Sequence, residues 1–424
     1  MFRRIVTRRQ HRVHFIRGNI STPAFRILLL APCCFRFRNT VRTHPSTSLA
    51  TWRVLPDDIS STDGTHRACW TPREAAGETP MLMTDQQVTN RPQNPEQQSS
   101  VYLAGSAFVT GSRTLPSEEI DRAFGMPIGK LRSRAGIESV AYVAPGETEL
   151  TLGTGAAQEA LHAAGCGSEE IDSIVATSET HHIYPSLAAQ LHSRIAARET
   201  CGAFDVGGAC LGLVNALAVA QSLIVSGKAR TVAVITADVH SRTLVPGRVA
   251  GEFGGLFGDG ASAFLLRGSE PKTGTLGYRL REFLFGCAGQ YSEAVKVEDR
   301  ANGTLDVVFD GEALSRAAIT RMEKVLSALE KLSAIPRSAV GAFATHQPNP
   351  RLLSLLAKVT GVPVETFPPI ARTAGNLGSS TCGAALHAAL QMFSACPLPG
   401  RKPIFLASLG PGLIFGGAWL AAAE

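Results

Sequence analysis

The stretch Cys-Gly-Ala-Phe-Asp-Val-Gly-Gly-Ala-Cys-Leu-Gly, residues 201–212, contains the most informative residue of the chain, Cys210. We predict a short buried strand over 203–207 and an apolar helix over 211–226. Cys210 therefore falls at a helix N-terminus, where the helix dipole and the free N–H groups favour an anion. We expect a stabilised thiolate there, which suits acyl transfer to sulfur.

Strand-like and helix-like segments alternate on both sides of this stretch. We predict further strands over 102–109, 171–178, 230–238, 261–266, 275–285, 340–345, 403–409 and 413–421. We predict further helices over 118–124, 149–164 (with Thr148 as N-cap), 185–195, 311–332, 350–360 and 383–393. Apolar strands alternating with helices indicate an α/β protein with helices on both faces of its sheets. The recurring order predicts an internal duplication, with halves at 101–270 and 271–424.

The net charge of +6 over 424 residues is unevenly distributed. Residues 1–56 hold 11 arginines and no Lys, Asp or Glu. Without them the 41 basic residues fall to 30, against 35 acidic ones, a net charge of −5. The body of the chain is thus mildly acidic, which argues against a nucleic-acid-binding protein.

Residues 1–100 are interpreted as an N-terminal extension. Three explanations stay open for its first 80 residues: a transit peptide, a disordered basic tail, or an over-extended start with initiation at Met81 or Met83. The apolar run 27–32 is far too short to span a bilayer, which needs about 20 residues. Residues 84–99 are polar and predicted to be disordered.

The nine cysteines are scattered and form no Cys-x-x-Cys motif. This usage predicts a cytoplasmic protein with reduced thiols, in which Cys201 and Cys382 are core residues. The neighbouring His181 and His182 invite a metal interpretation, but no third ligand follows at a suitable spacing. We therefore predict no metal site.

Three segments carry the chemistry. They are Cys210 itself, the run His346-Gln-Pro-Asn-Pro-Arg351, and the run Gly375-Asn-Leu-Gly-Ser-Ser380. The cysteine can hold an acyl group, while His346 and Asn376 can donate hydrogen bonds to the carbonyl oxygen of a second thioester. Those hydrogen bonds would stabilise the enolate that forms when a malonyl group loses CO2.

Two more segments complete a pattern of five in order. They are Arg134-Ala135-Gly136-Ile137 and Phe257-Gly258-Asp259-Gly260-Ala261. The other three are Phe204–Leu213 around the cysteine, the set of His346, Gln347, Asn349 and Arg351, and Gly375-Asn376. From about residue 101 to 424, the chain resembles the β-ketoacyl-acyl-carrier-protein synthase III family of the thiolase superfamily. The resemblance implies a thiolase-like fold with two similar βαβαβαββ halves in α-β-α-β-α layers.

The resemblance also implies residue roles. Cys210 would be the acyl-accepting nucleophile, and His346 and Asn376 would promote decarboxylation. The backbone N–H groups of Cys210 and Gly412 would form the oxyanion hole, although Pro411 replaces the middle glycine of the family's Gly-Gly-Gly run. Tyr184 corresponds to a phenylalanine at the floor of the acyl pocket, which in the family comes from the partner subunit of a homodimer.

The expected substrates are acyl and malonyl thioesters, with no cofactor and no membrane. Lys130 stands where the family has a tryptophan that stacks on the adenine of coenzyme A. A lysine offers no aromatic face, so acyl carrier protein becomes the favoured primer donor and partner. Candidate substrate-binding residues are Lys130, Arg134, Arg248, Asn349 and Arg351.

The leading hypothesis is decarboxylative condensation, in fatty-acid initiation or in a specialised pathway. A first alternative is an acyltransferase on the same fold that moves the acyl group to a hydroxyl or an amine. A second is a Cys-His-Asn hydrolase, for which the Gly258-Asp259-Gly260 run would have no role. A third is a catalytically silent partner in a heteromeric synthase.

Overall fold

The computed structural model describes residues 100–269, 276–300, 305–309, 311–397 and 400–423. The predictions for the N-terminal extension lie outside the described residues, except at residue 100, and they stay predictions.

The first half of the body forms five strands: β1 (Val101–Thr110), β4 (Ser173–Thr177), β5 (Gly202–Asp205), β6 (Thr231–Val239) and β7 (Asp259–Arg267). Their order across the sheet is β1-β7-β6-β4-β5. β4 runs parallel to both β5 and β6, whereas β7 runs antiparallel to β6 and β1. β6 is buried along its whole length, which explains its continuous apolar sequence.

The second half repeats this order with β8 (Tyr278–Cys287), β11 (Ala342–Thr345), β12 (Ile404–Gly410) and β13 (Ile414–Ala422). The strands lie in the order β11-β12-β13-β8, with β11 parallel to β12 and β13 antiparallel to both β12 and β8. Among the described residues, no strand takes the place that β5 holds in the first half. Three residue pairs between β1 and β8 join the halves into one nine-stranded sheet.

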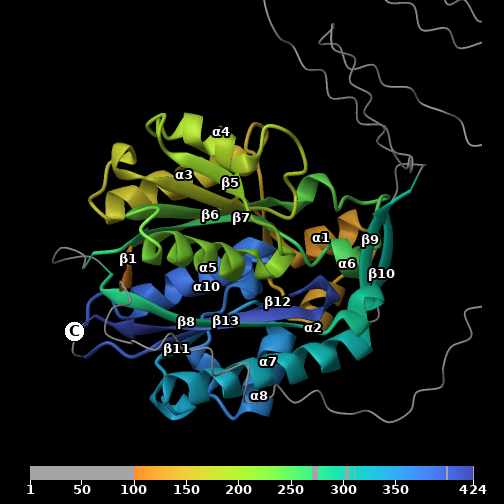
Figure 1. Ribbon diagram of the computed structural model, residues 1–424. Coiled ribbons are helices and arrows are strands. Elements are labelled where there is room, and N and C mark those ends of the chain that lie inside the picture. The colour runs from red at the N-terminus through yellow and green to blue at the C-terminus, as the bar shows by residue number, and fades with distance from the viewer. Residues whose placement is uncertain (1–99, 270–275, 301–304, 310, 398–399, 424) are drawn as a thin grey trace, which may run out of the picture. The chain divides into compact units, whose positions relative to one another are not determined.

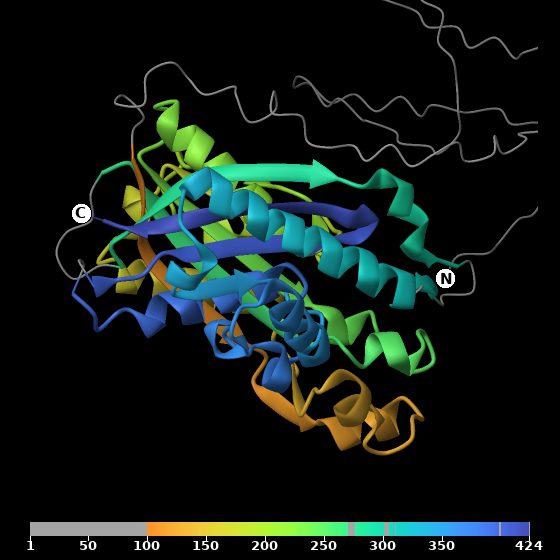
Figure 2. The ribbon, with the colours of Figure 1, turned by 90° about the horizontal axis from the view of Figure 1, so that it is seen from below.

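Helices form three layers around these strands (Figures 1 and 2). α3 (Glu149–Ala163) and α4 (Leu187–Arg194) cover the outer face of the first half, and α7 (Gly311–Ser333) and α8 (Pro350–Thr360) cover that of the second. α5 (Gly212–Val225) and α10 (Ser379–Met392) lie between the two sets of strands. The predicted fold class, with its α-β-α-β-α layers, is confirmed.

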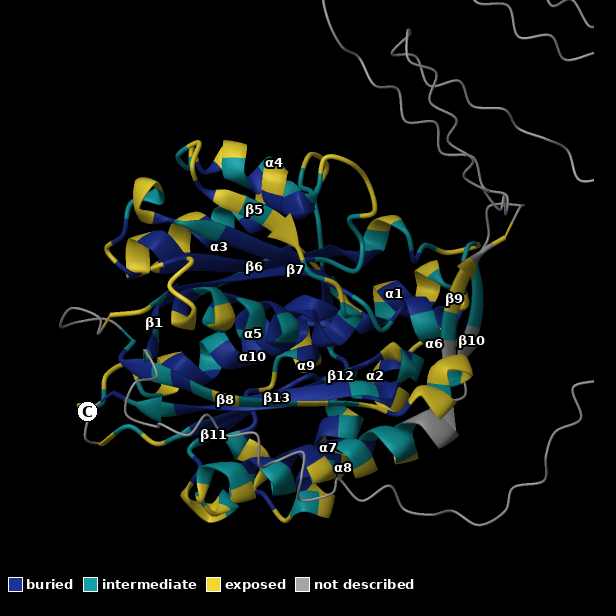
Figure 3. Ribbon diagram, viewed as in Figure 1, coloured by how far each residue is buried: buried dark blue, intermediate teal, exposed yellow. Residues whose placement is uncertain are grey.

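Three hydrophobic clusters match the interfaces between layers. The central one joins residues of α5 and α10, such as Leu217 and Leu386, to residues of both sets of strands. A second packs α3 and α4 against the first half, and a third packs α7 and α8 against the second. α10 is buried on nearly all sides, which fits its central place (Figure 3).

Most predicted elements are confirmed, with small differences at their ends. Thr148 caps α3 as expected, because its hydroxyl accepts a hydrogen bond from the Thr151 N–H in a reciprocal capping box. α4 begins two residues later than predicted, at Leu187, because Ser186 caps it. α10 begins four residues earlier than predicted, at Ser379.

Several short elements were not predicted. They are the antiparallel pairs β2 (Arg113–Pro116) with β3 (Ser139–Tyr142) and β9 (Val295–Asp299) with β10 (Leu305–Phe309), and the helices α2 (Lys130–Ala135), α6 (Gly251–Gly254) and α9 (Ala371–Ala374). α1 (Ser117–Ala123) was predicted. Across the part of the chain that is described, no helix is long and apolar enough to cross a membrane.

Candidate active site

Cys210 lies in a sharp turn between β5 and α5. Gly208 and Ala209 both have positive φ, 139° and 47°, and a single 3-10 turn over Ala209–Leu211 leads into α5. The left-handed conformation of Ala209 costs about 1–2 kcal/mol, so the surrounding packing must enforce it. Ser408 contributes to this, because its hydroxyl donates a 2.7 Å hydrogen bond to the Cys210 carbonyl oxygen.

His346 follows directly after β11 and is buried. Its backbone N–H donates to the Ala407 carbonyl, which fixes the residue at the carboxyl end of the strand. Its Nδ1 has no hydrogen-bond partner among the described residues. Burial lowers the pKa of His346 to about 4, despite the opposing effect of Glu179, so the imidazole is neutral near pH 7.

Asn376 lies in the turn before α10, and its side-chain oxygen is fully engaged. Oδ1 accepts hydrogen bonds from the Gly378 N–H and the Thr381 hydroxyl, both 3.1 Å long. These two bonds orient the amide so that its NH2 group is the end available for donation. Donation to a carbonyl oxygen is the role that enolate stabilisation requires.

The Phe-Gly-Asp-Gly-Ala run holds the Asn376 turn in place. The Asn376 N–H donates to the Leu256 carbonyl, and the Gly258 N–H donates to the Asn376 carbonyl. A Cβ on Gly258 would lie 2.1 Å from the Ala374 carbonyl oxygen, so only glycine permits this approach. Asp259 is fully buried and accepts hydrogen bonds from Ser241 and from the Val143 N–H.

The Arg-x-Gly-Ile run packs α2 against the start of α8. Gly136 ends α2 with φ of 81°, and a Cβ there would lie 3.2 Å from Pro350 Cβ. Arg351 lies at the same contact, and its guanidinium donates a hydrogen bond to the Ser133 carbonyl oxygen. The run therefore positions the loop that carries His346.

Two buried side chains that no motif predicted lie at the centre of these groups. Glu179 follows β4 by two residues, and His240 follows β6 directly. Glu179 Oε2 lies 3.6 Å from His240 Nε2. Glu179 interacts electrostatically with both Cys210 and His346, and a Cβ on Gly378 would lie 2.9 Å from its Oε1. Glu179 therefore lies near Cys210 and His346 and against the turn that follows Asn376.

Asp238 anchors the same region from the end of β6. It is fully buried and accepts hydrogen bonds from the Glu179 N–H at 2.6 Å, the Ser379 hydroxyl at 2.6 Å, and the Ser380 N–H and hydroxyl at 3.2 Å each. Burial first, and then the Glu179 charge, raise the pKa of Asp238 to about 6. Asp238 therefore ties the Glu179 segment of the first half to the start of α10 in the second.

A sequence rule could have indicated Glu179 and His240. Both follow the carboxyl ends of predicted buried strands, and β4 and β6 are parallel neighbours. Polar residues at adjacent carboxyl ends meet at one edge of a sheet, where ligands bind in α/β proteins. Neither residue belongs to a recognisable motif, which is why they were missed.

The expected resting thiolate is wrong. Burial raises the pKa of Cys210 well above its usual value, and the charges of Glu179 and Asp238 raise it further. The helix dipole acts in the opposite direction, but Cys210 lies a turn before α5 and beside a carboxylate. Cys210 is therefore a thiol at rest and needs a proton acceptor when it attacks.

The segment expected to complete the oxyanion hole lies beside the cysteine turn. A Cβ on Gly410 would come within 2.9 Å of the Gly208 carbonyl oxygen, so the two turns are in close contact. Pro411 opens a short 3-10 turn in which Gly412 has φ of 75°. The role of the Cys210 and Gly412 N–H groups as an oxyanion hole stays a prediction.

The structure separates Tyr184 from the Cys210 site of its own chain. Its side chain is 95% exposed, next to Ile183, which is 65% exposed. β5 is an edge strand of the sheet, and its Phe204 is also exposed, so the predicted burial of this strand is wrong.

The predicted substrate-binding residues differ in their surroundings. Lys130 forms an ion pair with Glu252, and Arg134 is exposed. Arg248 is half-buried and donates to the Thr243 carbonyl. Arg351 is exposed at the start of α8.

Asn349 has a structural function that its sequence position alone did not reveal. It is the N-cap of α8, and its side-chain oxygen accepts a hydrogen bond from the Leu352 N–H at 3.0 Å.

Cys382 and Cys201 are buried, as predicted.

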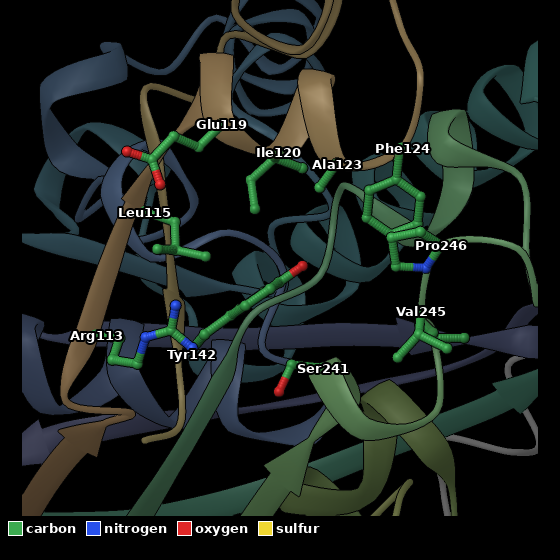
Figure 4. A pocket seen from close by; sticks show the side chains of 11 residues that line it. Arg113, Leu115, Glu119, Ile120, Ala123, Phe124, Tyr142, Ser241, Val245 and Pro246 are labelled. Carbon is green, nitrogen blue, oxygen red and sulfur yellow. The ribbon is translucent and has the colours of Figure 1, made fainter. Parts of the chain in front are cut away.

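A hollow of about 260 Å³ lies elsewhere, between α1, the β2–β3 pair and residues 241–246. Leu115, Glu119, Ile120 and Tyr142 face one another around it (Figure 4). Cys210, His346 and Asn376 do not line this hollow, so it is separate from the predicted catalytic groups.

Comparison with known proteins agrees with this geometry. Two family models match the chain: 3-oxoacyl-[acyl-carrier-protein (ACP)] synthase III over residues 204–283, and its C-terminal domain over residues 331–422. The β-ketoacyl-[acyl-carrier-protein] synthase III of Serratia proteamaculans is 32% identical over 298 residues, which cover 68% of this chain and 88% of that protein. The enzyme of the same name from Citrobacter koseri is 30% identical over 294 residues, with the same coverage.

Solved structures agree on the fold. The synthase III of Aquifex aeolicus matches with a TM-score of 0.66 and 25% identity, covering 76% of this chain and 99% of that one. An OleA variant from Xanthomonas campestris matches with a TM-score of 0.68 and 21% identity, covering 76% of this chain and 98% of that one. The fold and the site define a thiolase-like condensing enzyme. The chain belongs to the β-ketoacyl-acyl-carrier-protein synthase III family.

Proposed function

We propose that this condensing enzyme takes an acyl group onto Cys210 and joins it to a malonyl thioester with loss of CO2, giving a β-ketoacyl thioester. The proposal is supported by one shared neighbour: the Glu179 carboxylate interacts with Cys210 and with the neutral His346, and it lies against Gly378 in the turn after Asn376. A nucleophile and two donors for an enolate oxygen are what the two half-reactions need.

In the first half-reaction, the Cys210 sulfur attacks the primer thioester, and the carrier sulfur leaves with the proton that the cysteine thiol gives up. In the second, the malonyl carboxylate leaves as CO2, and the C–C electron pair forms an enolate held by His346 and Asn376. The enolate carbon attacks the acyl group, and the cysteine sulfur leaves as a thiolate that takes a proton from water. Simple acyl transfer to an alcohol would not need this enolate-binding pair, so the Asn376 geometry favours condensation over the acyltransferase alternative.

The thioester carrier is part of the proposal. Lys130 is engaged with Glu252 and offers no ring for adenine, which supports acyl carrier protein as the primer donor. Exposed Arg134 and Arg351 near α2 and α8 would attract an acidic carrier protein. Fatty-acid initiation and a specialised pathway are the two settings that this chemistry fits.

A homodimer and a cytoplasmic location complete the proposal. Ile183, Tyr184 and Phe204 are exposed at or near the edge strand β5, which supports pairing of two copies there. Tyr184 would then reach the acyl pocket of the partner. Six cysteines among the described residues are free thiols, which supports a reducing compartment.

The test uses the full chain with malonyl-carrier protein and a series of acyl thioesters on coenzyme A and on carrier protein. We expect CO2 release and a β-ketoacyl product whose carbon count is that of the primer plus the two retained malonyl carbons. Acyl loading without CO2 release from any malonyl donor would contradict the proposal and favour an acyltransferase.

A further inference from the structure

The Glu179 carboxylate lies beside Cys210, where it can accept the thiol proton during acylation, but loss of CO2 and formation of the C–C bond need no base. Its side chain is 16% exposed, and Oε2 faces His240 Nε2 at 3.6 Å. Its other oxygen, Oε1, is buried and has no hydrogen-bond partner among the described residues. Oε1 lies against the turn that follows Asn376: the position that a Cβ on Gly378 would take is 2.9 Å from it. At rest the carboxylate interacts with the Cys210 thiol, and acylation of the sulfur removes that donor just before the second substrate binds.

The surroundings of His240 favour an ionised Glu179. His240 Nδ1 lies 2.9 Å from the Gly258 carbonyl oxygen, which can only accept, so Nδ1 carries a proton. A neutral ring would then turn the bare Nε2 lone pair toward the Glu179 carboxylate. A protonated ring instead gives an ion pair, and the pKa of His240 is accordingly raised to about 9 by Glu179 and Asp238, against the effect of burial. Burial would raise the pKa of Glu179, but His240 and Cys210 outweigh it and lower the pKa.

An ionised carboxylate at this point fits poorly with a malonyl group as the only second substrate. Decarboxylation needs no base, because the electron pair of the broken C–C bond becomes the enolate. The malonyl carboxylate would also meet a like charge at Glu179, which disfavours its binding. An acyl thioester without that carboxylate has the opposite requirement, since a base must remove its α-proton.

We propose that Glu179 is the general base of a second condensation, in which the enolate forms by deprotonation of a simple acyl thioester and no CO2 is lost. This inference rests on the proposed function, because it uses the same acyl-Cys210 and the same enolate-binding pair, His346 and Asn376. The second substrate class is an acyl thioester with at least one α-hydrogen. The product is a β-ketoacyl thioester that carries the α-substituent of the second chain.

Protons and electrons balance within the residues named. Glu179 takes the α-proton, and the C–H electron pair becomes the enolate. The enolate carbon attacks the acyl carbonyl, the C–S bond to Cys210 breaks, and the thiolate sulfur takes the proton back from the Glu179 carboxylic acid beside it. Both groups return to their starting states, so no further reactant is needed. His240 acts as a positioning residue that keeps Glu179 ionised and in place.

The experiment follows two reactions of the full chain in parallel. The first is loss of deuterium from acyl thioesters carrying two α-deuterons, of short, medium and long chain, on coenzyme A and on carrier protein. The second is CO2 release from malonyl-carrier protein, which reports a folded site that does not depend on a base. Glu179→Gln keeps the shape of the side chain, and Glu159→Gln, on the exposed face of α3, is the matched control.

We expect the wild-type chain and Glu159→Gln to exchange α-deuterons and to form β-ketoacyl product from acyl thioesters alone. In Glu179→Gln the α-exchange should fall by about 100-fold or more relative to CO2 release, which is the size of a general-base contribution.

Three results would overturn the inference. One is CO2 release by the wild-type chain with no α-exchange and no product from acyl thioesters alone. Another is unchanged exchange in Glu179→Gln, and the third is equal loss of exchange and CO2 release in that variant, which would mean that Glu179 only supports the site. Failure of the proposed function looks different, since the wild-type chain would then release no CO2 and accept no acyl group.

Discussion

The two halves of the molecule place different chemistry at equivalent points of one topology. In the first half, β4 is followed by Glu179, and the turn before α5 carries Cys210. In the second half, β11 is followed by His346, and the turn before α10 carries Asn376. The first pair is an acid and a nucleophile, whereas the second pair is a neutral imidazole and an amide, both suited to donate hydrogen bonds.

The two halves share one strand order but carry different side chains at equivalent turns. Strand order and the central helices fix where the two turns meet, and Asp238 links them across the halves. On the proposed function, the identity of four side chains assigns the acyl group to one turn and the enolate to the other. If acyl loading and enolate formation are separate tasks, a change in one turn should spare the reaction assigned to the other.

The largest expected effect is a separation of the two half-reactions. His346→Ala and Asn376→Ala should each lower CO2 release from malonyl-carrier protein by about 10²–10³-fold, because each removes one donor to the enolate oxygen. Both variants should still acquire an acyl group on Cys210. Cys210→Ala should show the reverse, with CO2 release retained and acyl loading lost. Equal loss of both activities in all three variants would show that the tasks are not divided between the turns.

The next effect concerns the support of the second turn. Gly258→Ala would place a Cβ 2.1 Å from the Ala374 carbonyl oxygen, so the Asn376 turn must shift. We expect a loss of about 1–3 kcal/mol in the free energy of unfolding, together with slower CO2 release. Gly155→Ala in α3 is the matched control, since nothing lies within 4 Å of its Cβ position. Normal CO2 release by Gly258→Ala would mean that this contact does not position Asn376.

A smaller effect concerns pH and the first pair. His240 faces Glu179, Asp238 and the Gly258 carbonyl, and its pKa is raised from 6.5 to about 9. The protonated ring therefore stabilises the fold fully below about pH 6.5, and this contribution is lost as the pH rises through 9. Urea unfolding at a series of pH values should show a decline over this window in the wild-type chain. The decline should be reduced in His240→Gln, and equal slopes would contradict the ion pair.

The smallest effect separates a structural role from substrate binding. Asn349→Ala removes the N-cap of α8 and should cost about 1 kcal/mol of unfolding free energy. Because its side-chain oxygen already binds the Leu352 N–H, we expect little change in the KM for malonyl-carrier protein beyond what the lost stability causes. Asn349→Asp, which can still cap the helix, should restore stability. A large rise in KM for both variants would return Asn349 to the substrate-binding set.

Sequence reasoning predicted what long, regular patterns encode. The sequence shows β6 and β7 as long apolar runs. It shows α3 as a helix with a capping residue at its start. Cys210, His346 and Asn376 are predicted as catalytic because each belongs to a short motif, and their roles stay a prediction. The reason for the Gly258 motif became visible only in three dimensions, where its backbone meets the Ala374 carbonyl.

What sequence reasoning could not supply was the effect of neighbours far apart in the chain. The four-residue strands β2 and β3 are partly exposed and lack the continuous buried run of β11, a strand of the same length. Glu179 and His240 are single residues whose meaning depends on β4 and β6 being adjacent. The state of Cys210 was predicted from its helix alone, and burial of the thiol, followed by the charge of Glu179, raises its pKa and reverses that prediction.

The central claim, that acyl groups pass through Cys210, is tested most directly by the mass of the intact protein. The full chain, Cys210→Ala and the control Cys396→Ala would each be incubated with acyl thioesters on coenzyme A and on carrier protein. We predict a gain of one acyl group in the wild-type chain and in Cys396→Ala, and none in Cys210→Ala. An acyl adduct that persists in Cys210→Ala would contradict the account, as would wild-type chain that forms β-ketoacyl product from the same donors and is never acylated.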